Sequence, residues 1–279
     1  MTDPPRVPEV RVPEVRVHEL GRADGPALVL LHGFTDSGLC WPDAVRRWRH
    51  DYRIVAPDAR GHGESSRFGP ATSGSNRFED LAADVVSVLE ALADEGSETP
   101  ILIGHFMGAG VTGAVLATRP DLVCAGVLEE PPWFTGPRGD DQPETTQQWV
   151  QGFRDDCDGA EARGRVENPR WPEIEFRPWA VSKAQLDSSL TDRGQIARQT
   201  PWIENAAAIT LPTLVVTRGR DEAVLVTSRS RERIAELGNR HIQVEVAPGA
   251  GHTVRRDCAE SYHQIVDPWI RRQFATAGS

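Results

Sequence analysis

The sequence has few cysteines, no long apolar run and no surplus of basic residues, and each shortage excludes a class of protein. Its 279 residues include only four cysteines, spaced without CxxC or CxH patterns, at Cys40, Cys124, Cys157 and Cys258. We therefore expect neither a disulfide framework nor a metal site, and a reducing, cytoplasmic location. No apolar stretch approaches the roughly 18 residues that a membrane span needs. Thirty-one Lys and Arg against 41 Asp and Glu give a net charge of −10, which argues against nucleic acid or an anionic membrane as a partner.

The beginning of the chain repeats a proline-containing pentapeptide. RVPEV occupies Arg6–Val10 and returns at Arg11–Val15. A proline every five residues rules out a helix and confines any strand to the edge of a sheet. We expect residues 1–12 to form a flexible or edge-strand tail.

Short apolar runs alternate with helical patterns from Ala27 onward. Runs typical of strands covered on both faces occur at Ala27–Leu31, Tyr52–Pro57, Ile101–Ile103, Ala125–Leu128, Thr213–Thr217 and Val244–Val246. Helical spacing or composition marks Phe78–Ala93, Gly108–Thr118 and Arg229–Leu237, the last closed by Gly238. Strands that alternate with helices predict an α/β fold with a mostly parallel, doubly wound sheet.

Residues 134–205 interrupt this alternation and read as an inserted helical cap on a core formed by 13–133 and 206–279. The segment lacks a convincing strand, and helices are expected at Thr145–Asp155 and Ser182–Leu190. It also contains Trp149, Trp171, Trp179 and Trp202. The tryptophans either attach the cap to the core or form an aromatic wall over a ligand pocket, in which case Trp133 and Trp179 would contact substrate.

Five motifs, in a fixed order, resemble those of the α/β-hydrolase superfamily of esterases and lactonases. They are HGF at 32–34, DARGHGES at 58–65, GHFMG at 104–108, LPTLVVTRGRD at 211–221 and APGAGH at 247–252. The resemblance extends from about residue 15 to 274. It implies the α/β-hydrolase fold, with an inserted cap.

The chain departs from that family at the residue that matters most for the chemistry. The middle of G-x-S-x-G is the family's nucleophile, on a sharp turn between a strand and a helix, and here that position is Phe106. A phenyl ring has no lone pair with which to attack a carbonyl. An acyl-enzyme on residue 106 is therefore excluded, as is the aspartate mechanism of epoxide hydrolases and dehalogenases.

The resemblance assigns the remaining parts of a hydrolase site to residues that are present. It places the general base at His252 and the oxyanion donors at the backbone N–H groups of Phe34 and Met107. We expect Gly33, beside them, to bind substrate. The acid that orients His252 is either Glu130 or Asp221. Arg218 stands where glycine is common in the family.

Three functions remain open on the sequence alone. The protein is an enzyme without a covalent nucleophile that uses His252 for acid/base chemistry on a moderately large, apolar ester, lactone or other carbonyl compound. Alternatively, it is a serine ester or lactone hydrolase inactivated at position 106, or a pseudoenzyme that only binds a small molecule. There is no GxGxxG fingerprint and no P-loop, so we expect no cofactor. We expect a monomer or homodimer.

Overall fold

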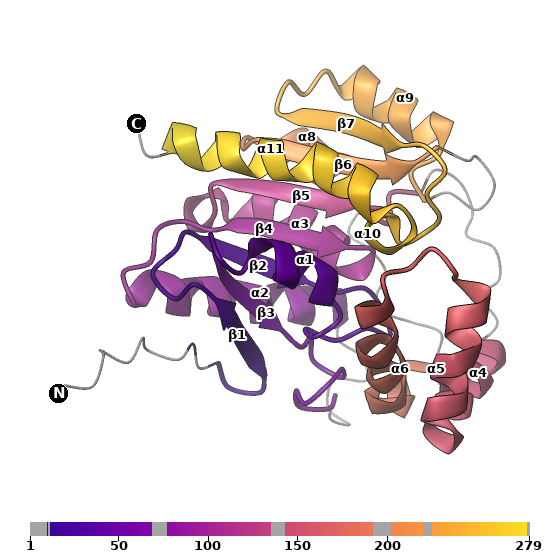
Figure 1. The fold of residues 1–279 in the computed structure, drawn as a ribbon. Coiled ribbons are helices and arrows are strands. Elements are labelled where there is room, and N and C mark those ends of the chain that lie inside the picture. The colour runs from indigo at the N-terminus through magenta and orange to yellow at the C-terminus, as the bar shows by residue number, and fades with distance from the viewer. Residues whose placement is uncertain are drawn as a thin grey trace, which may run out of the picture.

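A seven-stranded sheet with helices on both faces forms the centre of the molecule (Figure 1). The structure is a computed structural model and describes residues 10, 12–68, 77–134, 143–191, 202–219 and 225–277. Six strands run parallel, and β1 is antiparallel to its neighbour β3 at one edge. The spatial order β1-β3-β2-β4-β5-β6-β7 confirms the predicted doubly wound sheet. The strands are β1 (Val17–Gly21), β2 (Ala27–Leu31), β3 (Arg53–Pro57), β4 (Ile101–His105), β5 (Ala125–Glu129), β6 (Thr213–Arg218) and β7 (Ile242–Ala247).

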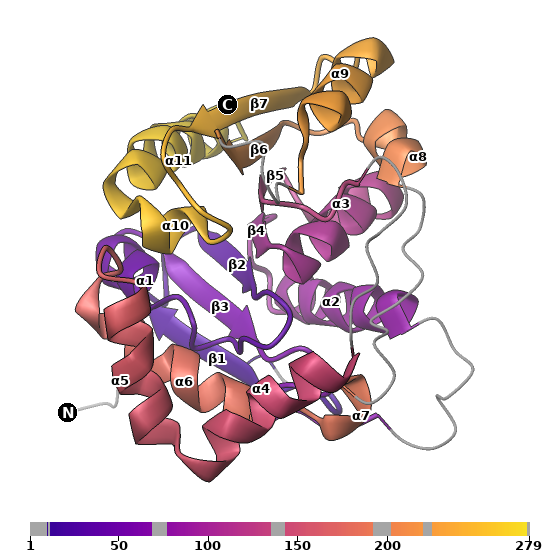
Figure 2. The ribbon, with the colours of Figure 1, turned by 90° about the vertical axis from the view of Figure 1, so that its right-hand side faces the viewer.

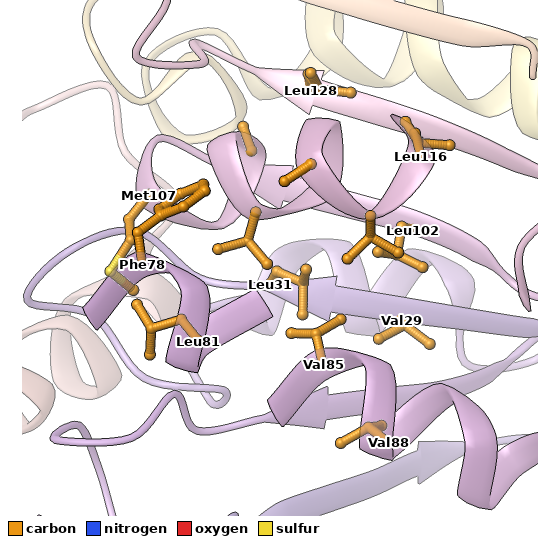
Figure 3. Close-up of a cluster of buried hydrophobic side chains, with 14 of the residues drawn as sticks. Val29, Leu31, Phe78, Leu81, Val85, Val88, Leu102, Met107, Leu116 and Leu128 are labelled. Atoms are coloured by element: carbon orange, nitrogen blue, oxygen red, sulfur yellow. The ribbon is translucent and has the colours of Figure 1, made fainter. Parts of the chain in front are cut away.

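The inner strands bury both of their faces, which explains why their sequences are apolar without alternation. In β2, Val29 and Leu31 join one apolar cluster, whereas Leu28 and Leu30 join another on the opposite face. Figure 3 shows the first cluster, in which side chains of β2 and β4 meet those of helices α2 and α3. Each face of the sheet therefore packs against its own layer of apolar side chains.

Each layer is covered by its own set of helices (Figure 2). One face carries α1 (Pro42–Trp48), α10 (Val254–Asp257) and α11 (Ala259–Ala277). The other carries α2 (Arg77–Asp94), α3 (Met107–Thr118), α8 (Trp202–Ala208) and α9 (Ser228–Leu237). The predicted helices at 78–93, 108–118 and 229–237 correspond to α2, α3 and α9, and Gly238 closes α9 in the left-handed conformation, as expected.

A separate group of helices lies beside the core, in the region where the cap is expected (Figures 1 and 2). It contains α4 (Pro143–Asp155), α5 (Cys157–Glu167), the short 3₁₀ helix η3 (Glu173–Glu175), α6 (Phe176–Gln185) and α7 (Ser188–Thr191). Helix α8 begins inside the expected cap range but packs against α3 of the core. The limits 134 and 205 stay a prediction.

The single helix predicted for Ser182–Leu190 is wrong, because the chain breaks into two helices there. Helix α6 ends at Gln185, and Leu186 is extended with ψ at 137°. Asp187 then accepts a hydrogen bond from the backbone N–H of Ser189 (2.9 Å) and starts α7. An aspartate that caps a new helix competes with continuation of the old one.

The structure bears only in part on two expectations, a flexible or edge-strand tail at residues 1–12 and the absence of a membrane span. Residues 1–9 and 11 of the expected tail lie outside the described residues. Val10 is buried, and the edge strand nearest in sequence is β1, which begins after the repeated prolines. No helix in the described part of the chain combines the length and apolar composition that a bilayer span requires.

Candidate active site

The carboxyl ends of the parallel strands bring the candidate residues to one edge of the sheet. The chain runs from β2 outward to β3 and then returns to β4 on the other side of β2, which makes the ends of β2 and β4 the switch point where such sheets bind ligands. Gly33 and Phe34 follow β2, Phe106 follows β4, Glu130 follows β5, Arg218 ends β6 and His252 follows β7.

Phe106 has the backbone conformation of a nucleophile elbow although its side chain is no nucleophile. Its φ and ψ are 48° and −106°, directly before α3. A Cβ atom on Gly104 would lie 2.4 Å from the carbonyl carbon of Gly108, and one on Gly108 would lie 2.1 Å from the carbonyl oxygen of Leu31. Both glycines are thus required by the tight turn. A non-glycine residue held at such a φ costs about 1–3 kcal/mol.

His252 lies against Phe106 and close to Glu130. The rings of Phe106 and His252 meet edge to face, with centroids 5.1 Å apart. His252 Nδ1 is 4.0 Å from Oε2 of Glu130, which is fully buried. The imidazole therefore has a carboxylate on its Nδ1 side and an aromatic ring at the family's nucleophile position.

The imidazole of His252 is neutral at pH 7. Desolvation, followed by the positive charge of Arg218, lowers the pKa of His252 to about 4. The side chain keeps 44% of its surface open to solvent, which screens part of this shift. Whether the pKa is lowered partly or fully, it stays below 7, so the ring is unprotonated and can accept a proton.

A buried histidine, His105, packs against the turn after β2. A Cβ on Gly33 would lie 2.6 Å from Nδ1 of His105, so a side chain there would displace the ring. His105 Nε2 lies 3.2 Å from the carbonyl oxygen of His252, and this contact requires the proton on Nε2. Burial holds the pKa of His105 well below its ordinary value. His105 thus connects the turn at Gly33 with the segment that carries His252.

Phe34 and Met107 are the two residues whose amides the family resemblance singles out. Phe34 follows Gly33 in a turn closed by the N–H of Asp36 and the carbonyl of Gly33 (3.0 Å). Met107 is the first residue of α3, so its N–H has no acceptor within that helix. The geometry is compatible with anion binding there, because the amino end of a helix favours negative charge.

The two tryptophans considered for substrate contact are occupied by packing. Trp133 is 2% exposed and stacks on Trp202 with centroids 5.3 Å apart. Trp179 is buried within the helices beside the core, where it meets Phe153 and Trp171 edge to face. These contacts agree with the packing alternative, and contact of either ring with a substrate stays a prediction.

Of the two acids considered as partners of His252, only Glu130 can be placed, because Asp221 lies outside the described residues. Glu130 has a positive φ of 46°. Its Oε1 accepts hydrogen bonds from the hydroxyl of Thr217 (2.5 Å) and the backbone N–H of Arg218 (3.0 Å). Its Oε2 accepts a longer one from the N–H of Leu225 (3.4 Å).

A buried network of six charged side chains, which the sequence reasoning missed, adjoins this site. It joins three acids to three bases, each at most 3% exposed: Asp36, Glu129, Glu175, Lys183, Arg255 and Arg256. Arg256 donates to Asp36 (3.0 Å) and Glu175 (2.8 Å), Arg255 donates to Glu129 (2.9 Å), and Lys183 pairs with Asp36. The network links η3 and α6 to the turn after β2 and to the helix that follows His252.

Asp36 is the centre of this network, and its charge is expected to be essential for stability. Desolvation alone would raise the pKa of Asp36, but the charges of Arg256, Lys183 and Arg255 outweigh it and hold the pKa well below the usual range. Asp36→Asn leaves three buried cations with two anions and should lower the free energy of unfolding by about 3–5 kcal/mol.

Urea denaturation with an unchanged m value measures this loss. Asp24→Asn is the matched control, because it removes the same charge from an exposed pair with Arg22 and should change little. Equal effects of the two substitutions would contradict the importance of the buried network.

The described residues offer no obvious metal centre. No group of three or more His, Cys, Asp or Glu side chains in the described ranges is arranged to hold a metal ion.

Comparison with known proteins agrees with this architecture. A model of the alpha/beta hydrolase family matches residues 28–264. Epoxide hydrolase B of Mycobacterium tuberculosis is 38% identical over 112 residues, which are 37% of this chain and 28% of that protein. Lipase LipV of the same organism is 34% identical over 171 residues, covering 60% of this chain and 58% of the lipase. The chain matches only about a quarter to a third of the length of the first curated relatives.

Solved structures show the same fold over nearly the whole chain. The crystal structure of E-2-(acetamidomethylene)succinate hydrolase has a TM-score of 0.74 at 24% identity and covers 92% of this chain and 95% of that one. The enol-lactonase from Burkholderia xenovorans has a TM-score of 0.67 at 18% identity, with coverage of 92% and 96%. With the family match over residues 28–264 and this shared architecture, the chain belongs to the alpha/beta hydrolase family.

Proposed function

We propose that this protein is a small-molecule enzyme that works at an ester, lactone or other carbonyl group through acid/base catalysis by His252, without an acyl-enzyme. The observation that carries the proposal is the environment of that imidazole. It is neutral and open to solvent, it has Glu130 on its Nδ1 side, and it faces hydrocarbon at residue 106. A base in this setting can activate water or deprotonate a substrate, but it has no hydroxyl at residue 106 to activate.

Hydrolysis would proceed by direct attack of water on the carbonyl carbon. His252 Nε2 takes one proton from the water as its oxygen bonds to that carbon, and the carbonyl oxygen becomes an oxyanion. The amides of Phe34 and Met107 would stabilise this charge. When the tetrahedral intermediate collapses, the carbon–oxygen bond to the leaving group breaks and His252 returns the proton to it. The products are a carboxylic acid and an alcohol.

Glu130 would stabilise the imidazolium that forms during this cycle. The present separation of 4.0 Å from Nδ1 is longer than a hydrogen bond. Catalytic hydrogen bonds are often long in unliganded enzymes and shorten when substrate binds. The three donors to Glu130 hold its carboxylate in place for that contact.

The pH dependence of kcat/KM on activated aryl esters and enol lactones tests the proposal. The base is active when neutral, and its pKa is lowered, so kcat/KM should rise with pH through one ionisation that lies below 6.5. Above it, we expect a plateau through neutral pH. Stopped-flow traces should show no burst of product.

Two results would overturn the proposal. A burst that matches the enzyme concentration would reveal a covalent intermediate. Ligand binding without turnover of any compound in the panel would instead indicate a protein that only binds small molecules.

A further inference from the structure

Arg218 is a mostly buried cation that the proposed chemistry does not use. It is the last residue of β6, and only 11% of its side chain is exposed. Its Nε is buried and has no hydrogen-bond partner within the described ranges. Among the described residues, its guanidinium forms one ion pair, with Glu130 at 3.8 Å, which is beyond hydrogen-bond distance. A buried donor left without an acceptor is costly and calls for an explanation.

Glu130 does not hydrogen-bond to this guanidinium, because the 3.8 Å between Arg218 Nε and Oε2 of Glu130 is too long for a hydrogen bond. Thr217 and the backbone of Arg218 donate to Oε1, and the backbone of Leu225 donates to Oε2. The other buried arginines near the site are differently placed. Arg255 and Arg256 each donate to a buried carboxylate of the charged network, although Arg255 Nε, like Arg218 Nε, has no partner among the described residues. Of these three arginines, Arg218 is thus the one whose side chain donates no hydrogen bond to the part of the chain that the structure describes.

Arg218 lies close to the place where the chemistry is proposed. The same oxygen, Oε2 of Glu130, is 3.8 Å from Arg218 Nε and 4.0 Å from His252 Nδ1. The guanidinium and the imidazole therefore lie near the same carboxylate oxygen. The planar fork of an arginine fits a carboxylate through two parallel hydrogen bonds.

We propose that Arg218 binds a carboxylate of the substrate, so that the preferred substrates are esters or lactones with a second, acidic group. The substrate preference rests on the proposed function, whereas carboxylate binding by Arg218 does not depend on it. The net charge of −10 disfavours anions in general, so selective binding of one requires a local cation. Arg218 provides that cation beside the reacting carbonyl.

Binding of succinate, compared with neutral succinamide, tests the site without any need for turnover. Nuclear magnetic resonance of the His252 imidazole should report succinate binding to the native protein and weaker binding of succinamide. Arg218→Gln should weaken succinate binding by about 10- to 100-fold, the range expected when charge-assisted hydrogen bonds are lost. Arg218→Lys, which keeps the charge but not the fork, should bind with intermediate affinity.

Arg49→Gln is the matched control, because it removes the same charge from an exposed residue that directly follows α1. It should bind succinate as the native protein does. Equal succinate affinity in Arg218→Gln and the native protein would overturn the inference. Equal weakening by Arg49→Gln would also overturn it, since the effect would then come from overall charge.

Turnover separates this inference from the proposed function. Arg218→Gln should lower kcat/KM for mono-p-nitrophenyl succinate at least about tenfold more than it lowers kcat/KM for the methyl ester of the same compound. If Arg218→Gln affects both esters equally, the assignment of Arg218 is wrong even though the enzyme is active. If neither ester is hydrolysed but succinate binding depends on Arg218, the carboxylate site stands and the proposed catalytic function fails.

Discussion

Replacing Phe106 with serine is expected to turn the protein into a target for fluorophosphonate probes, which should not label residue 106 of the native chain. The elbow already holds position 106 in the nucleophile conformation, next to His252. A serine there would place a hydroxyl near a neutral imidazole, which can take its proton as the substrate is attacked. Removing the serine from a serine hydrolase costs on the order of 10⁶ in turnover. We therefore expect Phe106→Ser to hydrolyse p-nitrophenyl acetate at least about 10²-fold faster than the native protein, with a burst.

Two further variants identify the cause of this gain. Phe106→Ala removes the ring without supplying a hydroxyl, so it should not be labelled. Adding His252→Ala to Phe106→Ser should abolish labelling, because the base is lost. If Phe106→Ser folds and stays unlabelled, the elbow and His252 are not arranged as a nucleophile and its base, and the site described above is wrong.

Replacing His252 with alanine is expected to lower kcat/KM of the native protein by about 10²- to 10⁴-fold, the contribution typical of a general acid or base. The side chain is partly exposed, so the substitution should leave the free energy of unfolding nearly unchanged. His50→Ala is the control, because His50 is exposed and lies in the turn after α1. Steady-state kinetics and urea denaturation separate lost catalysis from lost structure.

The same variant distinguishes catalysis from binding. A protein that only binds its ligand would not depend on His252 as a base. A loss of kcat/KM of less than about threefold in His252→Ala would be too small for a general base and would argue for a different catalytic group.

The fold could be predicted from the sequence because its strands are local and strongly patterned. ALVLL at 27–31 and the other apolar runs became β2 to β7, since strands covered on both faces need no polar positions. The glycines at 104 and 108 predicted a tight turn, and the contacts that a Cβ would make there explain why. Strand β1 and the break at Leu186 were missed, because an edge strand and a helix boundary depend on tertiary contacts.

The buried charges show what a single sequence conceals. Asp36, Lys183 and Arg256 lie far apart in the chain, and each looks like a surface residue until the fold brings them together. Arg218 gave one early signal, since it occupies a position where glycine is common in the family. That signal alone could not reveal a chemical role. The role depends on the position of Arg218 beside the carboxylate of Glu130, which is 88 residues away along the chain.

The most direct test of direct water attack is intact-mass spectrometry of the native protein, quenched by acid during turnover of an activated aryl ester. The account predicts only the unmodified mass at every time point, because His252 acts on water and no residue becomes acylated. Accumulation of a species heavier by the acyl group, on any residue, would contradict it.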